Sequence, residues 1–290
     1  MTQQRALLAI HVAAFLFGLT GILGTLIQAP PAAITAGRAL FAVGALILIR
    51  RRALASRHST LSRPQIYLLG FSGGCLALHW LTFFVSIKTG GVAIATLGFA
   101  SFPAFIMLGE RLLFKDDVQR AEWGVLACIS IGVVLITPAF ELANQLTIGL
   151  LWGLLSGLTF ALATLTNRPL AAQLPPTQVA LWQNAVVLGL SIPWAGASLI
   201  SLNAIDWMWM AILGVLCTAY AHVLIVKSMQ QLTARHTGVI IALEPVYAIV
   251  LAALLFNQIP TLTMIIGGSL MIAAIIYNGT VDTKKSPSPE

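Results

Sequence analysis

Ten apolar stretches, each about as long as a membrane-spanning helix, occupy most of this 290-residue chain. A helix needs about 20 predominantly apolar residues to cross the hydrocarbon core of a bilayer. Backbone polar groups in lipid must be satisfied within the segment, so unbroken apolar runs without alternation predict helices rather than strands. The expected spans are residues 6–27, 32–50, 65–87, 91–110, 120–137, 147–166, 177–199, 207–227, 237–256 and 260–278.

The composition excludes a soluble protein of this length. Hydrophobic residues make up 58% of the chain and charged residues 9%, whereas about a quarter of the residues of a soluble domain are charged. The first stretch also exceeds the apolar core of a cleaved signal peptide, which is about 7–15 residues long. We therefore expect a retained first helix and a multi-pass protein of a bacterial-type cytoplasmic (inner) membrane. Residues 281–290 are predicted to be a disordered cytoplasmic tail.

The basic residues predict which side of the membrane each connection occupies. Fourteen of the 16 lysines and arginines fall at the termini and in alternate connections, whereas the opposite side carries only Lys88. Because lysine and arginine accumulate in cytoplasmic loops, both termini are expected to be cytoplasmic. The basic residues follow the loops and form no binding stripe, so the net charge of +7 does not indicate a nucleic-acid partner.

The second five stretches read as a diverged copy of the first five. Residues 17–26 and 156–165 are identical at six of ten positions. A constant offset of 142 pairs Cys75 with Cys217, Ser86 with Ser228, Pro103 with Pro245, and 112–114 with 254–256. Because five crossings is an odd number, the second copy must be inverted relative to the first. The predicted fold is an all-α membrane protein, with ten transmembrane helices in two inverted five-helix repeats, residues 1–140 and 141–280, around a central cavity.

Pro103 and Pro245 predict matching kinks in the fourth and ninth spans. Proline has no N–H, so each should free the carbonyl four residues earlier, at Phe99 and Ile241. A freed carbonyl at membrane depth is tolerated where it faces protein or a wet cavity. We interpret the two prolines as hinges beside a shared cavity, with two simple packing kinks as the alternative.

Three ionisable residues lie deep in predicted spans, where such groups are functional candidates. His79 offers one donor and one acceptor, which can contact the polar end of a substrate or bridge two helices. Glu244 can take part in substrate or proton binding, or it can join helices. Arg38 has no acidic neighbour in its own helix, so its charge is expected to extend towards the membrane surface, with a role in the transport pathway as the alternative.

Aromatic and small residues complete the candidate site. Flat apolar side chains suit flat apolar ligands, although core packing accounts equally well for any one of them. Small residues in the first and sixth spans leave room beside a cavity or let helices approach closely. With His79 and Glu244, the candidate substrate-binding residues are Phe17, Leu78, Phe83, Phe99, Thr159, Ala163, Trp182 and Tyr220.

Over nearly its whole length, the chain resembles the EamA family of the drug/metabolite transporter superfamily. The resemblance rests on the two five-helix halves, on Arg38, on Glu244-Pro245 and on the Gly-Glu-Arg sequence of 109–111. Within that family, the Leu-His-Trp segment at 78–80 looks most like the YddG-type amino-acid exporters. Gln258 departs from the family pattern, which often carries a Gly-Glu pair after the ninth helix.

This resemblance implies a secondary transporter that exports amino acids, aromatic or other apolar ones above all, by alternating access. Helices 1–4 and 6–9 would then surround the cavity, with helices 5 and 10 at the periphery. Export of drugs, nucleobases or other small metabolites is the alternative, followed by a passive channel. Proton antiport and facilitated diffusion both remain open as the energy coupling.

Other function classes find no support in the sequence. It contains no phosphate-binding P-loop, no zinc-protease or nucleophile-elbow motif, and no metal-ligand spacing among its three cysteines. We therefore expect no enzyme activity, no catalytic residue, no metal and no cofactor. The expected partners are a small-molecule substrate, an amino acid, and the lipid bilayer, with a monomer as the working expectation.

Overall fold

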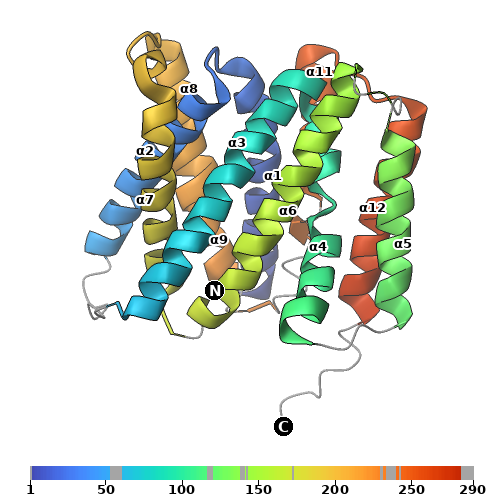
Figure 1. Cartoon of the computed structure of the whole chain (residues 1–290), viewed down its shortest axis with the longest axis horizontal. Coiled ribbons are helices and arrows are strands. Elements are labelled where there is room, and N and C mark those ends of the chain that lie inside the picture. The colour runs from blue at the N-terminus through green and yellow to red at the C-terminus, as the bar shows by residue number, and fades with distance from the viewer. Residues whose placement is uncertain are drawn as a thin grey trace.

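The computed structural model describes residues 2–52, 61–115, 120–137, 141, 143–171, 173–228, 231–232, 240–241 and 243–281. Over these ranges the chain forms a bundle of helices and contains no strand (Figure 1). The elements are α1 (Gln3–Leu26), α2 (Pro31–Arg52), α3 (Arg63–Phe99), α4 (Phe102–Gly109), η1 (Glu110–Phe114), α5 (Arg120–Ile136), α6 (Gln145–Ala171), α7 (Pro176–Ala195), η2 (Gly196–Leu199), α8 (Ala204–Gly214), η3 (Val215–Tyr220), α9 (Ala221–Ser228), α11 (Glu244–Phe256) and α12 (Leu262–Val281).

The all-α prediction is confirmed for the described ranges, but the ten predicted spans are not reproduced as ten long helices. Six helices there are long and apolar enough to cross a membrane, and three further apolar helices are shorter. The shorter ones are Trp123–Ile136, Glu244–Phe256 and Leu262–Tyr277. Parts of the predicted ninth span, and residues 282–290 of the predicted tail, lie outside the described residues.

The third and fourth predicted spans are joined without a loop. Helix α3 runs through both and turns at Gly91, whose φ of 81° and ψ of 174° suit glycine alone. The N–H of Val92, just after the turn, donates to Oε1 of Gln258 at 3.2 Å. Where the resemblance predicts a Gly-Glu pair, an uncharged glutamine side chain therefore caps the second segment of α3.

The predicted proline kinks are wrong in detail, because the chain breaks each helix instead of bending it. Helix α3 ends at Phe99, and Pro103 is the second residue of the new helix α4. Likewise, Pro245 is the second residue of α11. An N–H in the first turn has no intrahelical partner to lose, so proline is tolerated there.

The two breaks share one backbone geometry at the offset of 142. The N–H of Ala104 donates to the Ser101 carbonyl, and the N–H of Val246 donates to the Leu243 carbonyl, each at 3.0 Å. Among the described residues, the non-glycine residues with positive φ are Lys115 (59°) and Asn257 (54°), which are also 142 apart. The two halves therefore share the same turn before the proline and the same left-handed end.

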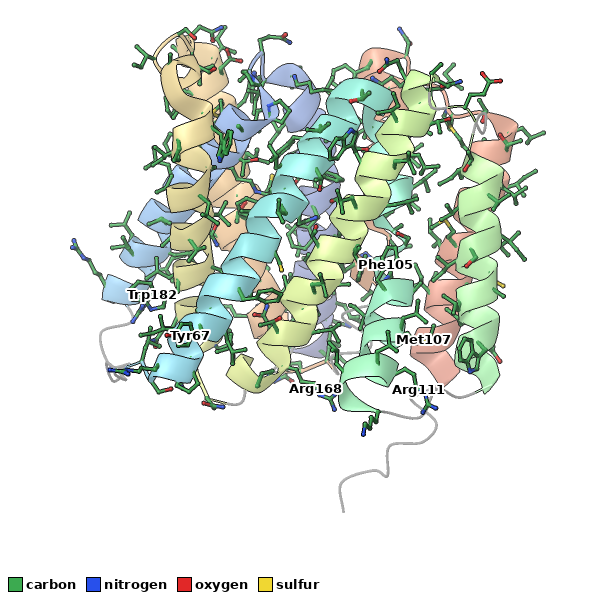
Figure 2. The ribbon with its side chains drawn as sticks, in the orientation of Figure 1. Tyr67, Phe105, Met107, Arg111, Arg168 and Trp182 are labelled. Atoms are coloured by element: carbon green, nitrogen blue, oxygen red, sulfur yellow. The ribbon has the colours of Figure 1, made fainter. Side chains whose placement is uncertain are left out.

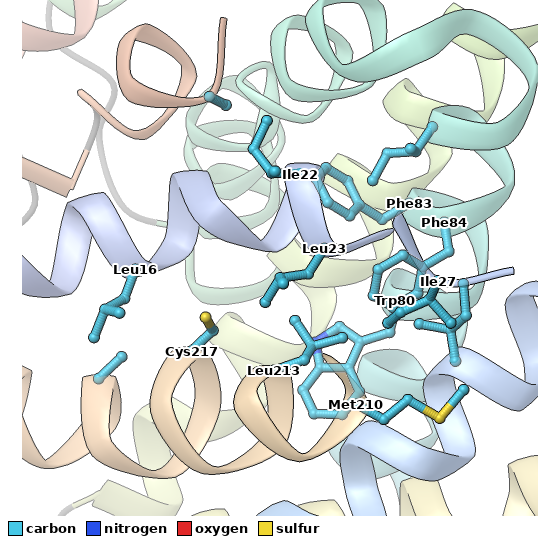
Figure 3. Packing of buried hydrophobic residues seen from close by; sticks show 14 of the residues in the cluster. Leu16, Ile22, Leu23, Ile27, Trp80, Phe83, Phe84, Met210, Leu213 and Cys217 are labelled. Atoms are coloured by element: carbon cyan, nitrogen blue, oxygen red, sulfur yellow. The ribbon is translucent and has the colours of Figure 1, made fainter. Parts of the chain in front are cut away.

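The first helix of each half packs against the third and fourth helices of the other half. Helix α1 contacts α9 and α11, and α6 contacts α3 and α4. Leu16, Leu23 and Cys217 belong to one buried apolar cluster that joins α1 to η3 (Figure 3). Helix α2 packs on α7, and α5 packs on α12 beside the main bundle (Figure 1).

Hydrogen bonds from two serines at the offset of 142 join the same helices across the two halves. The Ser86 hydroxyl on α3 donates to the Gly149 carbonyl of α6 at 2.6 Å. Its counterpart Ser228 on α9 donates to the Ala6 carbonyl of α1 at 3.1 Å. In lipid such bonds satisfy polar groups that would otherwise be buried without partners, so they fasten the two halves to each other.

Candidate functional site

A cavity of about 410 Å³ lies inside the bundle, between elements of both halves. Its lining comes from α1, α2, α3 and α4 in the first half and from α6, α7, η3, α9 and α11 in the second. Small-molecule sites typically occupy about 300–1,000 Å³, so this cavity is large enough for a ligand of modest size.

Five pairs of residues at the offset of 142, all from the third and fourth predicted spans of each half, line this one cavity. Their first-half members are apolar or aromatic, whereas three of their second-half members are polar. The pairs are Leu76 with Thr218, Trp80 with His222, Phe83 with Ile225, Phe99 with Ile241, and Phe102 with Glu244. Matching positions of the two halves therefore line one cavity, with more polar side chains in the second half than in the first.

His79 is buried and joins α3 to α6. Its Nδ1 lies 2.8 Å from Oγ and 3.2 Å from the carbonyl oxygen of Ser156. The Ser156 hydroxyl donates in turn to the His79 carbonyl at 3.1 Å. Since Nδ1 faces two acceptors, we assign the proton to Nδ1, which leaves Nε2 as an acceptor. Helix bridging, one of the two roles expected for His79, is therefore present, and the ring also lines the cavity.

A cluster of phenylalanine rings surrounds the His79 imidazole. The His79 ring centroid lies 5.0 Å from those of both Phe99 and Phe160. Phe102 stacks on Phe99 at 5.1 Å, and Phe83 meets Phe99 edge-on at 5.8 Å. Offset and edge-to-face contacts of this kind are the arrangements that aromatic rings prefer.

The expectation that Arg38 extends towards the membrane surface is wrong. Its side chain is 6% exposed and lines the cavity. Nε donates to Oγ1 of Thr218 at 2.8 Å, and the guanidinium lies 3.9 Å above the ring of Trp80. Thr218 is in the π-helical segment η3, where its hydroxyl donates to the Leu213 carbonyl at 2.9 Å. These partners on η3 and α3 hold the charge inside, because a guanidinium stacks favourably on an indole.

Glu244 is the first residue of α11 and is 9% exposed. It lines the same cavity as Arg38. The N-terminal end of a helix favours a negative charge, which suits a carboxylate at this position. Both side chains are described by the structure, yet no ion pair joins them.

The structure brings six of the predicted residues to this cavity: Phe17, His79, Phe83, Phe99, Ala163 and Glu244. It does not bring Thr159, Trp182 or Tyr220 there. The Thr159 hydroxyl is buried against the Leu155 carbonyl at 2.9 Å. Trp182, near the lower end of α7 in Figure 2, is 43% exposed, and Tyr220 is 46% exposed.

Leu78 belongs to a different hollow. A second, mostly apolar pocket of about 470 Å³ lies between α2, α3 and α7, and Leu78, Phe71 and Trp194 line it. Successive residues of a helix point in different directions. Leu78 therefore turns away from the inner cavity that its neighbour His79 faces.

Phe102 and Phe160 line the cavity but were absent from the predicted site. Phe102 directly precedes Pro103, and Phe160 falls in the repeated segment 156–165, so both had a sequence signal. Asn184 and His222 carry buried atoms, Oδ1 and Nε2, without a hydrogen-bond partner. Within the described ranges, no three His, Cys, Asp or Glu residues are grouped as metal ligands would be.

Comparison with known proteins places the chain in a family. A family model described as "EamA-like transporter family" matches residues 4–137 and, a second time, residues 147–280. The chain belongs to the EamA-like transporter family. It is therefore a multi-pass membrane transporter, and the two matches correspond to its two halves.

Individual relatives agree with this assignment. An uncharacterized transporter of Archaeoglobus fulgidus is 24% identical over 221 residues, covering 74% of this chain and 76% of the relative. The pseudopaline exporter CntI of Pseudomonas aeruginosa is 24% identical over 287 residues, covering 95% and 96%. One solved crystal structure superposes with a TM-score of 0.67 at 17% identity, over 98% of this chain and all of the other, which shows a shared fold.

Proposed function

We propose that this transporter exports amino acids, with aromatic or other apolar ones favoured, across the cytoplasmic membrane. The observation that carries the proposal is the inner cavity, in which a cluster of phenylalanine rings lies beside buried polar and charged groups. An aromatic amino acid has the same division between a flat apolar ring and a polar end. This specificity is that of the YddG-type exporters, which the segment 78–80 resembles.

The rings and His79 give the two ends of such a ligand separate contacts. Phe83, Phe99 and Phe102 supply apolar faces for the side chain of the substrate. Nε2 of His79 has no hydrogen-bond partner among the described residues and can accept from an ammonium group. Ser156 fixes the ring through Nδ1, so the acceptor is held in place before the ligand arrives.

Movement across the membrane requires the cavity to open to either side in turn, and we propose an inverted repeat for this purpose. Its support is the exchange of packing partners between α1 and α6, together with the matching helix breaks. Arg111 and Arg168 lie at one edge of the bundle, where α1 begins and α12 ends (Figure 2). We assign this basic edge to the cytoplasm, with residues 1–140 and 141–280 as the two repeats.

Replacing His79 with alanine should slow counterflow of labelled phenylalanine in proteoliposomes at least tenfold. A hydrogen bond to a charged group contributes about 1.5–3 kcal/mol, and about 1.4 kcal/mol corresponds to a factor of ten. His11→Ala is the matched control, because His11 is exposed on α1 and bonds only the Tyr247 hydroxyl, at 3.2 Å. The absence of uptake above empty liposomes for every amino acid would reject the proposal.

Export of another small metabolite is the second candidate. The near full-length similarity to the pseudopaline exporter CntI favours it. A panel of unlabelled solutes, tested as competitors of phenylalanine counterflow, separates the two candidates. Amino acids should compete best under the proposal, whereas strong competition by non-amino-acid solutes alone would favour the metabolite. A passive channel would instead give non-saturating flux without counterflow.

A further inference from the structure

Two side chains of opposite formal charge line the inner cavity without forming an ion pair. Arg38 projects from α2 and Glu244 from the start of α11, and both line the cavity. No ion pair joins these two side chains, both of which the structure describes. The charges therefore differ from a structural salt bridge, whose groups would be in contact.

The Arg38 side chain is held so that part of its guanidinium remains available. Nε is bound to Thr218, and one face covers Trp80. Among the residues that the structure describes, no acceptor is bound to either Nη group. Two parallel N–H groups on a guanidinium match the two oxygens of a carboxylate, so the free edge of Arg38 suits a carboxylate ligand.

Glu244, in contrast, has acceptor oxygens that lack a donor among the described residues. No described residue donates a hydrogen bond to its carboxylate, although the side chain is 9% exposed. Asn184 lines the same cavity, and its Oδ1 is a buried acceptor without a partner in a side chain that is only 4% exposed. The Asn184 amide nitrogen already donates to the Ala180 carbonyl at 2.8 Å, so Oδ1 is the atom that still needs a donor.

The charge of the ligand follows from this arrangement. An unpaired charge inside a protein costs several kcal/mol in lost hydration. An anion would neutralise Arg38 and leave Glu244 unpaired, and a cation would do the reverse. A neutral solute would leave both charges unpaired. Only a ligand with both charges satisfies the two groups at once.

We infer that Arg38 and Glu244 form a divided receptor for a zwitterion, in which Arg38 binds the carboxylate and Glu244, alongside Nε2 of His79, binds the ammonium group. This inference rests on the proposed function and names the feature by which the cavity selects amino acids. The phenylalanine rings select the side chain, whereas the two charges require an intact α-ammonium and α-carboxylate.

The test compares three solutes that share one ring: phenylalanine, 3-phenylpropionate, which lacks the ammonium, and phenethylamine, which lacks the carboxylate. Saturable counterflow is measured in proteoliposomes after subtraction of empty liposomes. Wild-type protein should carry phenylalanine at least tenfold faster than either analogue. Similar rates for all three would overturn the divided receptor but leave amino-acid export standing. No saturable flux of any amino acid would reject the proposed function, and the inference with it.

Two variants test which residue recognises the carboxylate of the ligand and which recognises its ammonium group. Glu244→Gln should reduce the preference for phenylalanine over 3-phenylpropionate at least tenfold, and Arg38→Gln should do the same for its preference over phenethylamine. These ratios come from one preparation, so a poor yield of folded variant does not affect them. Glu141→Gln and Arg63→Gln, both exposed, should leave the ratios unchanged. Unchanged ratios in the cavity variants would overturn the assignment.

If a variant no longer transports any solute, ligand binding is measured instead. A ligand that binds only the folded state raises the melting temperature. Phenylalanine should therefore stabilise detergent-solubilised wild type more than either analogue does. The stabilisation by phenylalanine should disappear in both Arg38→Gln and Glu244→Gln. If both variants keep the full shift, the two charges do not hold the ligand.

Discussion

Gly214→Val is expected to give little folded protein, because the end of α8 touches the backbone of α2. A β-carbon at Gly214 would lie 2.5 Å from the carbonyl oxygen of Arg38, 2.7 Å from Cβ of Phe41 and 3.0 Å from the backbone nitrogen of Ala42. Small residues let membrane helices approach this closely. A helix backbone cannot move aside as a flexible side chain does, so the two helices would have to separate.

The expected cost lies at the upper end of the roughly 1–3 kcal/mol that overpacking typically takes, or above it. The measurement is the yield of monodisperse protein in detergent and its melting temperature. Gly189→Val is the matched control, because Gly189 on α7 has no atom within 4 Å of an added β-carbon. Equal yields and melting temperatures for the two variants would show that α2 and α8 are not in backbone contact.

Gly18→Leu and Gly157→Leu should each slow phenylalanine counterflow at least tenfold, and to a similar extent. Each glycine packs closely against the helix break of the opposite half. A β-carbon at Gly18 would lie 3.1 Å from the carbonyl oxygen of Glu244, and one at Gly157 would lie 3.0 Å from that of Phe99. Larger side chains would push the breaks away from the cavity that both breaks line.

The similar size of the two effects is the informative part. The two glycines are equivalent in the segments 17–26 and 156–165. If the two halves act as a repeat, transport requires the close contact at both glycines. The control is Gly189→Leu, reconstituted and assayed in the same way, because it adds the same side chain to a membrane helix where there is open space. If only one of the two variants were impaired, the breaks would not act as an equivalent pair.

Much of the architecture was predictable from the sequence, because the length of apolar runs and the constant offset of 142 are strong signals. The breaks before Pro103 and Pro245 were predicted as kinks, since the sequence shows the missing N–H but not whether the helix restarts. The direct passage through Gly91 was also missed. The sequence around Gly91 predicts a short loop, because the hydrogen bond from the Val92 N–H to Gln258 that stabilises the turn joins residues far apart in the chain.

The cavity was harder to predict than the fold. In lipid, the outer face of a helix is as apolar as its inner face, so the sequence does not reveal which aromatic residues point inward. Trp182 and Tyr220 were predicted because they are aromatic residues on candidate cavity helices, but they are 43% and 46% exposed and do not line the cavity. Arg38 was assigned to the surface because its own helix holds no acid. Its partners, Trp80 and Thr218, come from distant segments that only the fold brings together.

The inverted repeat is tested most directly at Lys115 and Asn257, which occupy the same position of the two copies and are both exposed. Helix α11 ends at the upper edge of the bundle, and η1, which follows α4, ends at the lower edge (Figure 1). The measurement is the labelling of single cysteines at these positions, after replacement of Cys75, Cys128 and Cys217, by a membrane-impermeant maleimide. In intact cells, Asn257→Cys should be labelled and Lys115→Cys should react only after permeabilisation. Labelling of both, or of neither, in intact cells would contradict the inverted arrangement.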